Sequence, residues 1–191
     1  MTTATRKQSD NIINGVNTEH VVDLAGNMQR DEGFAQFRFR ATTNWIDAAH
    51  SRSTIKAYFA GHEERTDRGA PHSVDADQPY FLGGTDRAPN PVEYVLHALN
   101  SCLTVTLVSH AAVQAVELEA VETSSEGVMD ARGFFGISDE VNKGYKRIRV
   151  RMQVKSDASV DALTAMAMHS PVYEMLSRAV PVDFELTKTI N

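Results

Sequence analysis

The spacing of apolar side chains predicts a helix near the N-terminus, followed by a strand-rich region. Apolar residues recur at helical spacing over residues 12–28, although two glycines in this stretch weaken the helix. Apolar and polar side chains alternate over residues 36–42, as in a half-buried strand, and residues 53–59 predict a second strand. Residues 47–50 between them predict a turn, so we expect a hairpin here.

Residues 61–90 are polar and rich in Gly, Pro and Asp. They predict a long connection that contains two short strands, near residues 72–75 and 79–82. Connections of this length are uncommon inside compact domains, and those that occur are often functional.

The clearest predicted element begins after Asn90. Asn90 suits the N-cap, Pro91 suits the first helical position, and Glu93 stands three residues after the cap. No Asp, Glu, Lys or Arg occurs over residues 94–116, so the helix is apolar nearly all round and must be buried on most sides. A helix of about 25 residues is about 37 Å long. One chain of 191 residues has difficulty covering such a helix, and a partner subunit would cover the rest.

Strands return after this helix. Residues 118–123 predict a strand, whereas residues 133–137, flanked by glycines, predict a loop or a short edge piece. Residues 147–155 alternate strictly, with Ile, Val and Met on one face and Arg, Gln and Lys on the other, as in a strand with one solvated face. Residues 181–186 predict the last strand.

Two short helices are predicted before that last strand. Ser156 or Asp157 is expected to cap the first, which extends to about His169. Pro171 interrupts the chain and allows a second short helix that ends at Ser177. Because the strands come in antiparallel runs rather than in strict alternation with helices, the predicted fold class is α+β.

Composition excludes several functions. Lys plus Arg number 19 and Asp plus Glu 25, giving a formal net charge of −6, which argues against non-specific binding to nucleic acid. No window reaches the roughly 18 consecutive apolar residues that span a membrane. The first ten residues also lack the apolar segment of a secretory signal. We therefore expect a cytoplasmic protein that binds neither membranes nor nucleic acid.

Cys102 is the only cysteine, which excludes an intramolecular disulfide and a Cys-rich zinc site. The histidines lie without recognised ligand spacing, so we expect neither a metal nor a cofactor. Two interpretations of Cys102 stay open. Its place deep inside an apolar helix favours an inert packing residue, and the alternative is a reactive thiol. His97 points about 140° away from it on an ideal helix, which argues against a Cys–His pair.

The segment around Cys102 resembles the OsmC/Ohr family, the osmotically inducible and organic hydroperoxide resistance proteins. The resemblance rests on Asn90-Pro91 followed by Glu93 and on the apolar helix with Cys102. It continues through the strand at residues 147–155 and through Ser170-Pro171-Val172. It covers residues 34–186, and we expect residues 1–33 to be an N-terminal helical extension of an OsmC-like domain at 34–191. The resemblance implies antiparallel-rich sheets around a long buried central helix, in an intertwined, strand-swapped homodimer.

The resemblance also implies site residues. Cys102 matches the cysteine that attacks peroxide, whereas Ser170 stands where the family has its second, resolving cysteine. The family's catalytic Glu follows the Pro directly; here that place holds Val92, and Glu93 comes one residue later. Arg52 and Arg87 are the candidates for the family's catalytic Arg.

Two functions follow as expectations. The first is an OsmC-like stress-response protein that reduces organic hydroperoxides with Cys102 and an external thiol, activated by Arg52 or Arg87 with Glu93. The alternative is a dimer that has lost this chemistry and binds a small apolar ligand, or senses oxidants, at its interface. Cys102 favours the first, whereas Ser170 and Val92 favour the second.

Overall fold

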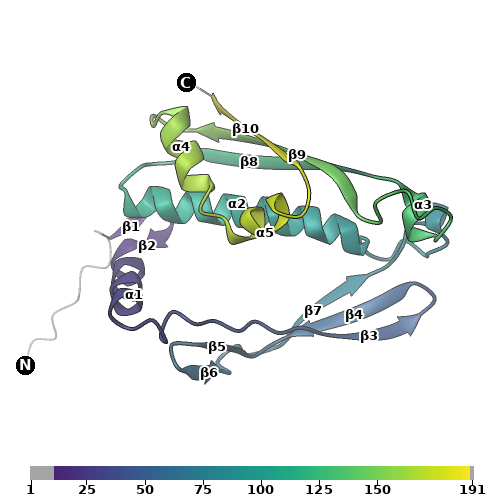
Figure 1. The fold of residues 1–191 in the computed structure, drawn as a ribbon. Helices are drawn as coiled ribbons and strands as arrows, with labels where there is room; N and C mark the ends of the chain where they lie inside the picture. The colour runs from purple at the N-terminus through teal and green to yellow at the C-terminus, as the bar shows by residue number, and fades with distance from the viewer. Residues whose placement is uncertain (1–10, 190–191) are drawn as a thin grey trace, which may run out of the picture. The chain divides into compact units, whose positions relative to one another are not determined.

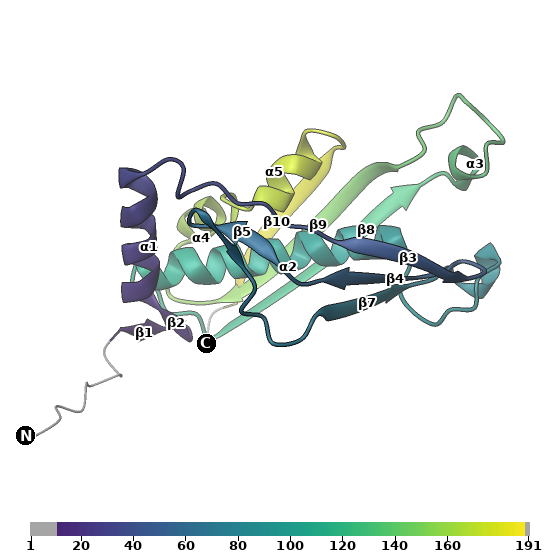
Figure 2. The same ribbon diagram turned by 90° about the horizontal axis from the view of Figure 1, so that it is seen from below.

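The computed structural model describes residues 11–189, which form two compact units (Figures 1 and 2). The first, here called the cysteine unit, comprises residues 11–19 together with 96–189 of the described chain; the second, His20–Val95, is called the hairpin unit. Both units combine helices with mainly antiparallel sheets, so the α+β class is confirmed.

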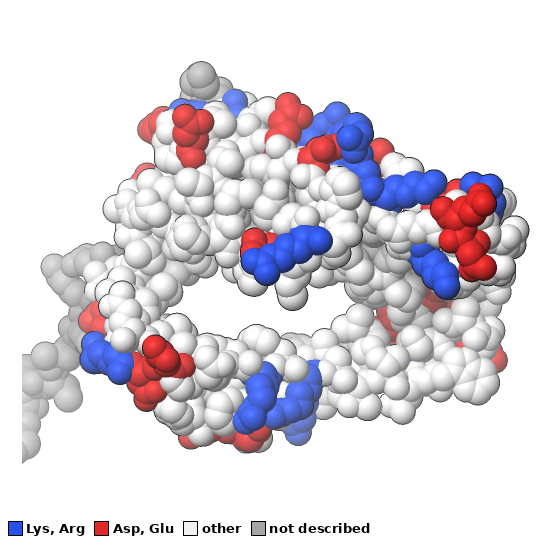
Figure 3. Space-filling view, viewed as in Figure 1, with Lys and Arg blue, Asp and Glu red and all other residues white. Residues whose placement is uncertain are grey.

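The larger sheet of the cysteine unit has three strands. Strands β8 (Ala120–Met129), β9 (Tyr145–Lys155) and β10 (Val182–Thr189) lie in the order β10-β9-β8; β8 is antiparallel to β9, whereas β10 is parallel to it. Burial alternates along β9 as its sequence predicts, because one face lies on the core. The other face carries intermingled charges, seen along this sheet in Figure 3, with ion pairs such as Arg147 Nε–Asp183 Oδ2 at 3.0 Å.

The core of the cysteine unit lies between this sheet and three helices. Helix α2 (Pro91–Val113) buries Leu99, Leu103 and Leu107 completely, and α4 (Val160–Ala167) adds Leu163. Helix α5 (Pro171–Ser177) lies beside α2 in both ribbon views. The apolar stripe of α2 is therefore matched by the inner face of β9, as expected for a buried helix.

Among the described residues, α2 is the one helix that is long and apolar enough to cross a membrane. Core helices of water-soluble proteins have the same composition, and the leucines of α2 lie on the sheet. The helix ends at Val113, within the uncharged stretch 94–116. Ala115 adopts φ 55°, and Val116 N–H donates to Ala111 C=O at 2.8 Å, so a left-handed residue terminates the helix.

The N-terminal helix is shorter than predicted. Residues 12–28 show helical spacing, but α1 spans Thr18–Arg30, and the residues before it form a hairpin of β1 (Ile12–Ile13) and β2 (Val16–Asn17). Asn14 and Gly15 both have positive φ, 52° and 78°, as a two-residue type I′ turn requires. The Asn-Gly pair therefore overrides the helical spacing before residue 18.

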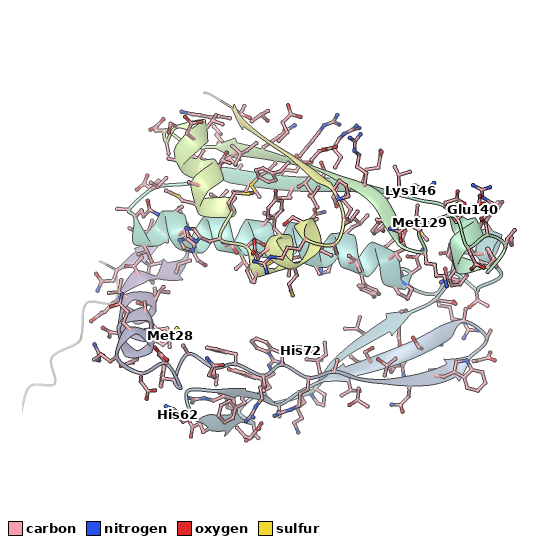
Figure 4. All side chains as sticks on the ribbon, in the orientation of Figure 1. Met28, His62, His72, Met129, Glu140 and Lys146 are labelled. Atoms are coloured by element: carbon pink, nitrogen blue, oxygen red, sulfur yellow. The ribbon has the colours of Figure 1, made fainter. Side chains whose placement is uncertain are left out.

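Two later boundaries also differ. Residues 131–134 form the short helix α3 (Ala131–Phe134), capped by Asp130, where a loop or edge piece is expected over 133–137. Lys146, labelled in Figure 4 beside α3, lies 3.2 Å from the same carboxylate. Ser159, rather than Ser156 or Asp157, caps α4, because the Ser156 hydroxyl donates instead to the Glu117 carbonyl at 2.7 Å.

In the hairpin unit, β3 (Thr42–Asp47), β4 (His50–Ile55) and β7 (His72–Ala76) form an antiparallel sheet in the order β3-β4-β7. The turn predicted over residues 47–50 is confirmed at 48–49, between the end of β3 and the start of β4, and the strand predicted near 72–75 is confirmed as β7. Beside this sheet, β5 (Tyr58–Ala60) and β6 (Glu63–Arg65) form a second hairpin.

Three predicted strands of this unit are wrong in part or in full. Residues 36–41 form only one bridge, Arg38 to Phe59, and the strand itself begins at Thr42 as β3. The stretch 53–59 is split between β4 and β5. Residues 79–82 form a 3₁₀ turn, η1 (Tyr80–Leu82), closed by Gly83 at φ 82°.

Candidate functional site

The start of α2 forms the predicted capping box. Asn90 Oδ1 accepts from the Glu93 N–H at 2.9 Å, and Glu93 Oε2 accepts from the Asn90 N–H at 2.7 Å. The Glu93 carboxylate is thus committed to the helix end. This gives Glu93 a structural role, and its predicted part in catalysis stays a prediction.

Cys102 lies near the middle of α2 and is half-buried, with a free thiol. It follows the fully buried Leu99 by three residues and precedes the fully buried Leu103, so it flanks the buried stripe. On the solvent side of the helix, Ser101 is exposed and Val105 is 59% exposed. A half-buried thiol can meet a small solute while keeping part of its surface in an apolar setting.

Ser170 is fully buried and caps α5, where its hydroxyl accepts from the Tyr173 N–H at 3.2 Å. The preceding His169 stacks on His110 of α2, with ring centroids 4.4 Å apart. His110 lies two turns after Cys102 and about 80° round the helix. The junction of α4 and α5 therefore meets α2 beyond Cys102, and the pKa of His110 is lowered by burial and by the neighbouring His169.

An open groove of about 620 Å³ follows another side of α2. Val105 and Val108 supply apolar walls, Thr104 and Thr123 are joined through their hydroxyls at 2.7 Å, and the buried Asn100 Oδ1 has no hydrogen-bond donor among the described residues. The groove centres about 120° round the helix from Cys102, so it is a separate feature of the cysteine unit.

Arg52 on β4 forms a two-pronged ion pair with Asp75 on β7. The distances are 2.6 Å for Nε–Oδ1 and 3.1 Å for Nη2–Oδ2, and the two residues face each other in the strand register. The hydrogen bond from Arg52, and then that from His50, lower the pKa of Asp75, although burial acts in the opposite direction. Sequence reasoning named Arg52 but missed its partner.

Arg87 belongs to a tight loop built around Asp77. The buried Asp77 carboxylate accepts from the Thr85 hydroxyl at 2.6 Å and from the backbone N–H groups of Gln78, Thr85 and Arg87. The Thr85 hydroxyl, together with these N–H groups, lowers the pKa of Asp77 to about 2, against the effect of burial. Arg87 is thereby fixed through its backbone.

The structure places the predicted site residues in two sets. Cys102 and Ser170 belong to the cysteine unit, whereas Arg52, Arg87 and Glu93 belong to the hairpin unit. Within residues 11–189, no three His, Cys, Asp or Glu side chains converge as metal ligands would. The pairing of Cys102 with an arginine therefore stays a prediction.

A family model described as OsmC-like protein matches residues 84–185, which contain Asn90-Pro91, Cys102 and Ser170-Pro171. The chain belongs to the OsmC-like protein family. No match to a curated protein is found.

Solved structures share the OsmC-like fold at low identity. An OsmC-like protein from Mycoplasma pneumoniae aligns with a TM-score of 0.60 at 11% identity, over 80% of this chain and 97% of that chain. An organic hydroperoxide resistance protein from Legionella pneumophila aligns with a TM-score of 0.52 at 22% identity, over 78% and 96%. A putative osmotic stress induced and detoxification response protein from Psychrobacter arcticus aligns with a TM-score of 0.58 at 11% identity, over 77% and 94%. At these identities the likeness establishes the fold.

Proposed function

We propose that this OsmC-like protein reduces organic hydroperoxides with Cys102 as a single redox cysteine, using an external thiol as reductant. The half-buried thiol of Cys102, twelve residues after Asn90 on the central helix of the family fold, is the observation that carries this proposal. Family membership supports it, as does the similarity to the organic hydroperoxide resistance protein from Legionella pneumophila.

The reaction balances with one cysteine. The Cys102 thiolate attacks the terminal oxygen of the hydroperoxide, the O–O bond breaks, and the alkoxide takes a proton to leave as an alcohol. Cys102 is left as a sulfenic acid. A first external thiol forms a mixed disulfide and releases water, and a second restores the Cys102 thiol as the external disulfide leaves.

Attack requires the thiolate, and an unassisted thiol with a pKa near 8.5 is only a few per cent ionised at pH 7. A guanidinium near the sulfur would favour the thiolate. Arg52 is the better candidate, because its guanidinium is held by two hydrogen bonds, whereas Arg87 is fixed only through its backbone. Val92 is apolar and cannot orient either arginine.

The proposal includes a strand-swapped homodimer. Residues 94–116 contain no formally charged side chain other than histidine, yet Val105 is 59% and Val113 43% exposed on the chain alone. Strand β8 is also an edge, with no hydrogen-bonded neighbour beyond it among the described strands. A second copy would cover the helix and pair the edge.

The alternative function is a dimer that binds a small apolar ligand or senses oxidants without turnover. The groove beside Val105 and Val108 favours it, because this groove offers apolar walls and the buried Asn100 Oδ1, which has no hydrogen-bond partner within residues 11–189. So does the Ser170 hydroxyl, which is committed to capping α5.

The test is the rate at which Cys102 reacts with cumene hydroperoxide at pH 7, measured by stopped flow and compared with N-acetylcysteine. Full ionisation alone would make Cys102 about 30-fold faster than a thiol of ordinary pKa. Mass spectrometry should find sulfenic acid, or a mixed disulfide when a thiol is added. A rate no greater than that of N-acetylcysteine would favour the alternative. The Cys102→Ser variant, which has no thiol, is the negative control for the reaction with hydroperoxide.

A further inference from the structure

Within the cysteine unit, helix α2 and strand β8 meet along a polar seam, formed by Asn100 and Thr104 of the helix and Thr123 and Ser125 of the strand. The seam holds two buried atoms, Asn100 Oδ1 and Ser125 Oγ, that have no hydrogen-bond partner within residues 11–189. Buried polar atoms in folded proteins are nearly always paired, so an unpaired one indicates a missing partner.

We propose that this seam and the groove beside it form a binding site for a small neutral alcohol. The hydroxyl of the ligand lies between Asn100 and Ser125, and its alkyl or aryl body lies in the groove. This inference goes beyond the redox chemistry of Cys102, and it gives the ligand-binding alternative a site and a ligand class.

The packing of α2 on β8 places the two unpaired atoms near each other. The hydroxyls of Thr104 and Thr123 meet at 2.7 Å, and the alternating burial of β8 puts Ser125 on the same face of the strand as Thr123. The chain reverses after α2, so β8 runs back along the helix (Figure 1). Two residues along a strand cover about 6.7 Å, and four residues back along a helix cover about 6 Å. Ser125 therefore lies beside Asn100.

The open groove of about 620 Å³ adjoins this seam. Asn100 and Thr123 belong to its lining, and Val105 and Val108 supply an apolar wall. The terminal torsion of an asparagine side chain has a broad preference, so a turn of the Asn100 amide brings Oδ1 to the groove surface. The unpaired atoms thus adjoin a space large enough for a small organic molecule.

The two unpaired atoms favour a hydroxyl group. Asn100 Oδ1 can only accept a hydrogen bond, whereas the Ser125 hydroxyl can donate one. An alcohol donates to the first and accepts from the second, but an ammonium cannot accept and a carboxylate cannot donate. None of the described residues that line the groove is Asp, Glu, Lys or Arg, and its histidine, His97, is exposed. A charged ligand would be costly to bury there without a partner, so the site suits a neutral one.

Two isomeric probes, 1-hexanol and methyl pentyl ether, test the site on the full chain. They have the same atomic composition, but only hexanol can donate a hydrogen bond. Binding is followed by NMR titration of ¹³C-labelled methyl groups, with Thr104, Val105 and Val108 of the groove as reporters. We expect hexanol to bind about fivefold more tightly than the ether, because its hydroxyl pairs with Asn100 Oδ1.

Two variants of the seam separate the roles of the two atoms. Asn100→Leu keeps the size of the side chain and removes the acceptor, so it should abolish the preference for hexanol. Ser125→Ala removes a donor that serves an alcohol and an ether oxygen equally, so it should weaken both probes and keep the preference. Circular dichroism confirms that each variant folds.

Two valine variants test the apolar wall. Val105→Ala should weaken both probes about threefold, because the alkyl chain loses contacts. The matched control is Val113→Ala, at a 43% exposed position of the same helix outside the groove, and it should change neither. Cys102→Ser should bind both probes as the wild type does, so the alcohol site and the peroxide reaction succeed or fail separately.

Equal binding of the two probes to the wild type, or a preference for hexanol that survives Asn100→Leu, overturns the proposal. The competing occupants are a second copy of the chain and ordered water. If neither probe shifts the groove methyl groups and Asn100→Leu changes the sedimentation coefficient, a second copy fills the groove. If neither probe shifts them and sedimentation is unchanged, water alone occupies the seam. Both results also overturn the alcohol site.

Discussion

The imidazole rings of His110 and His169 stack with centroids 4.4 Å apart and planes 7° from parallel, joining α2 to the residue before the Ser170 cap. Burial, and then the charge of His169, lower the pKa of His110. In the unfolded chain a histidine titrates near pH 6.5. The stack therefore contributes fully above pH 6.5, and its contribution is lost as the pH falls toward the lower folded value.

This predicts that the free energy of unfolding decreases below pH 6.5, and that His110→Gln makes the decrease shallower. Urea unfolding between pH 7.5 and 5 checks it, with His97→Gln, an exposed position on the same helix, as the control. If the free energy of unfolding depends on pH in the same way for the wild type and His110→Gln, the stack is not coupled to protonation of His110.

A second pH effect is expected at Asp77, whose pKa is lowered to about 2. Because the folded value lies below the ordinary 3.8, the stabilisation is complete above pH 3.8 and is lost as the pH falls toward 2. Asp77→Asn should remove it and should speed hydrogen exchange at the Thr85 and Arg87 amides at neutral pH. Unchanged exchange at both amides would contradict the role of Asp77 as the centre of this loop.

Asn14 joins the N-terminal hairpin to the segment after α2. Its Nδ2 donates to the Val116 carbonyl and its Oδ1 accepts from the Leu118 N–H, both at 2.9 Å. Asn14→Ala should lower the free energy of unfolding by about 2 kcal/mol, from two lost hydrogen bonds and from the positive φ. Asn14→Gly tolerates that φ, so it isolates the hydrogen bonds. Equal free energies of unfolding for Asn14→Gly and wild type in urea titrations would show that the two Asn14 hydrogen bonds contribute nothing to stability.

Glu93 offers a test of capping against catalysis. In a capping box Gln can replace Glu, so Glu93→Gln should keep the melting temperature within about 2 °C, whereas Glu93→Ala and Asn90→Ala should each lose about 1 kcal/mol. If Glu93→Gln folds as the wild type does but loses peroxide reduction, the carboxylate has a chemical role beyond the cap.

The parts of the fold that sequence reasoning predicted correctly are governed by local physics. Asn90 and Glu93 cap α2 because the box lies within four residues, and β9 alternates because its side chains have a period of two. The N-terminal hairpin was missed although its signal, the Asn14-Gly15 pair, is local and readable. The spacing of apolar residues favours a helix there, but the Asn-Gly turn determines the structure.

The candidate site was harder, because its partners are distant in sequence. Asp75 meets Arg52 only through the register between β4 and β7, which are separated by the β5–β6 hairpin. No spacing rule within one segment could pair them. Ser170 was placed correctly before a helix that begins at Pro171, but its complete burial follows from tertiary packing.

The last prediction concerns the family's second, resolving cysteine, whose place is taken here by Ser170. Ser170→Cys should lower the free energy of unfolding by about 1 kcal/mol, because sulfur is a weak acceptor and the Tyr173 N–H loses its cap.

If the chain keeps the family's placement of its second cysteine, one equivalent of cumene hydroperoxide should consume both thiols of Ser170→Cys without added reductant. Combining Ser170→Cys with Val92→Glu should raise dithiol-dependent turnover above wild type. Peptide mapping of the oxidised single variant gives the linkage, and Ser177→Cys at the C-terminal end of α5 is the matched control. A sulfenic acid at Cys102 beside a free thiol at position 170 would mean that the two positions do not meet, and Cys102 would then depend on external thiols even with a second cysteine present.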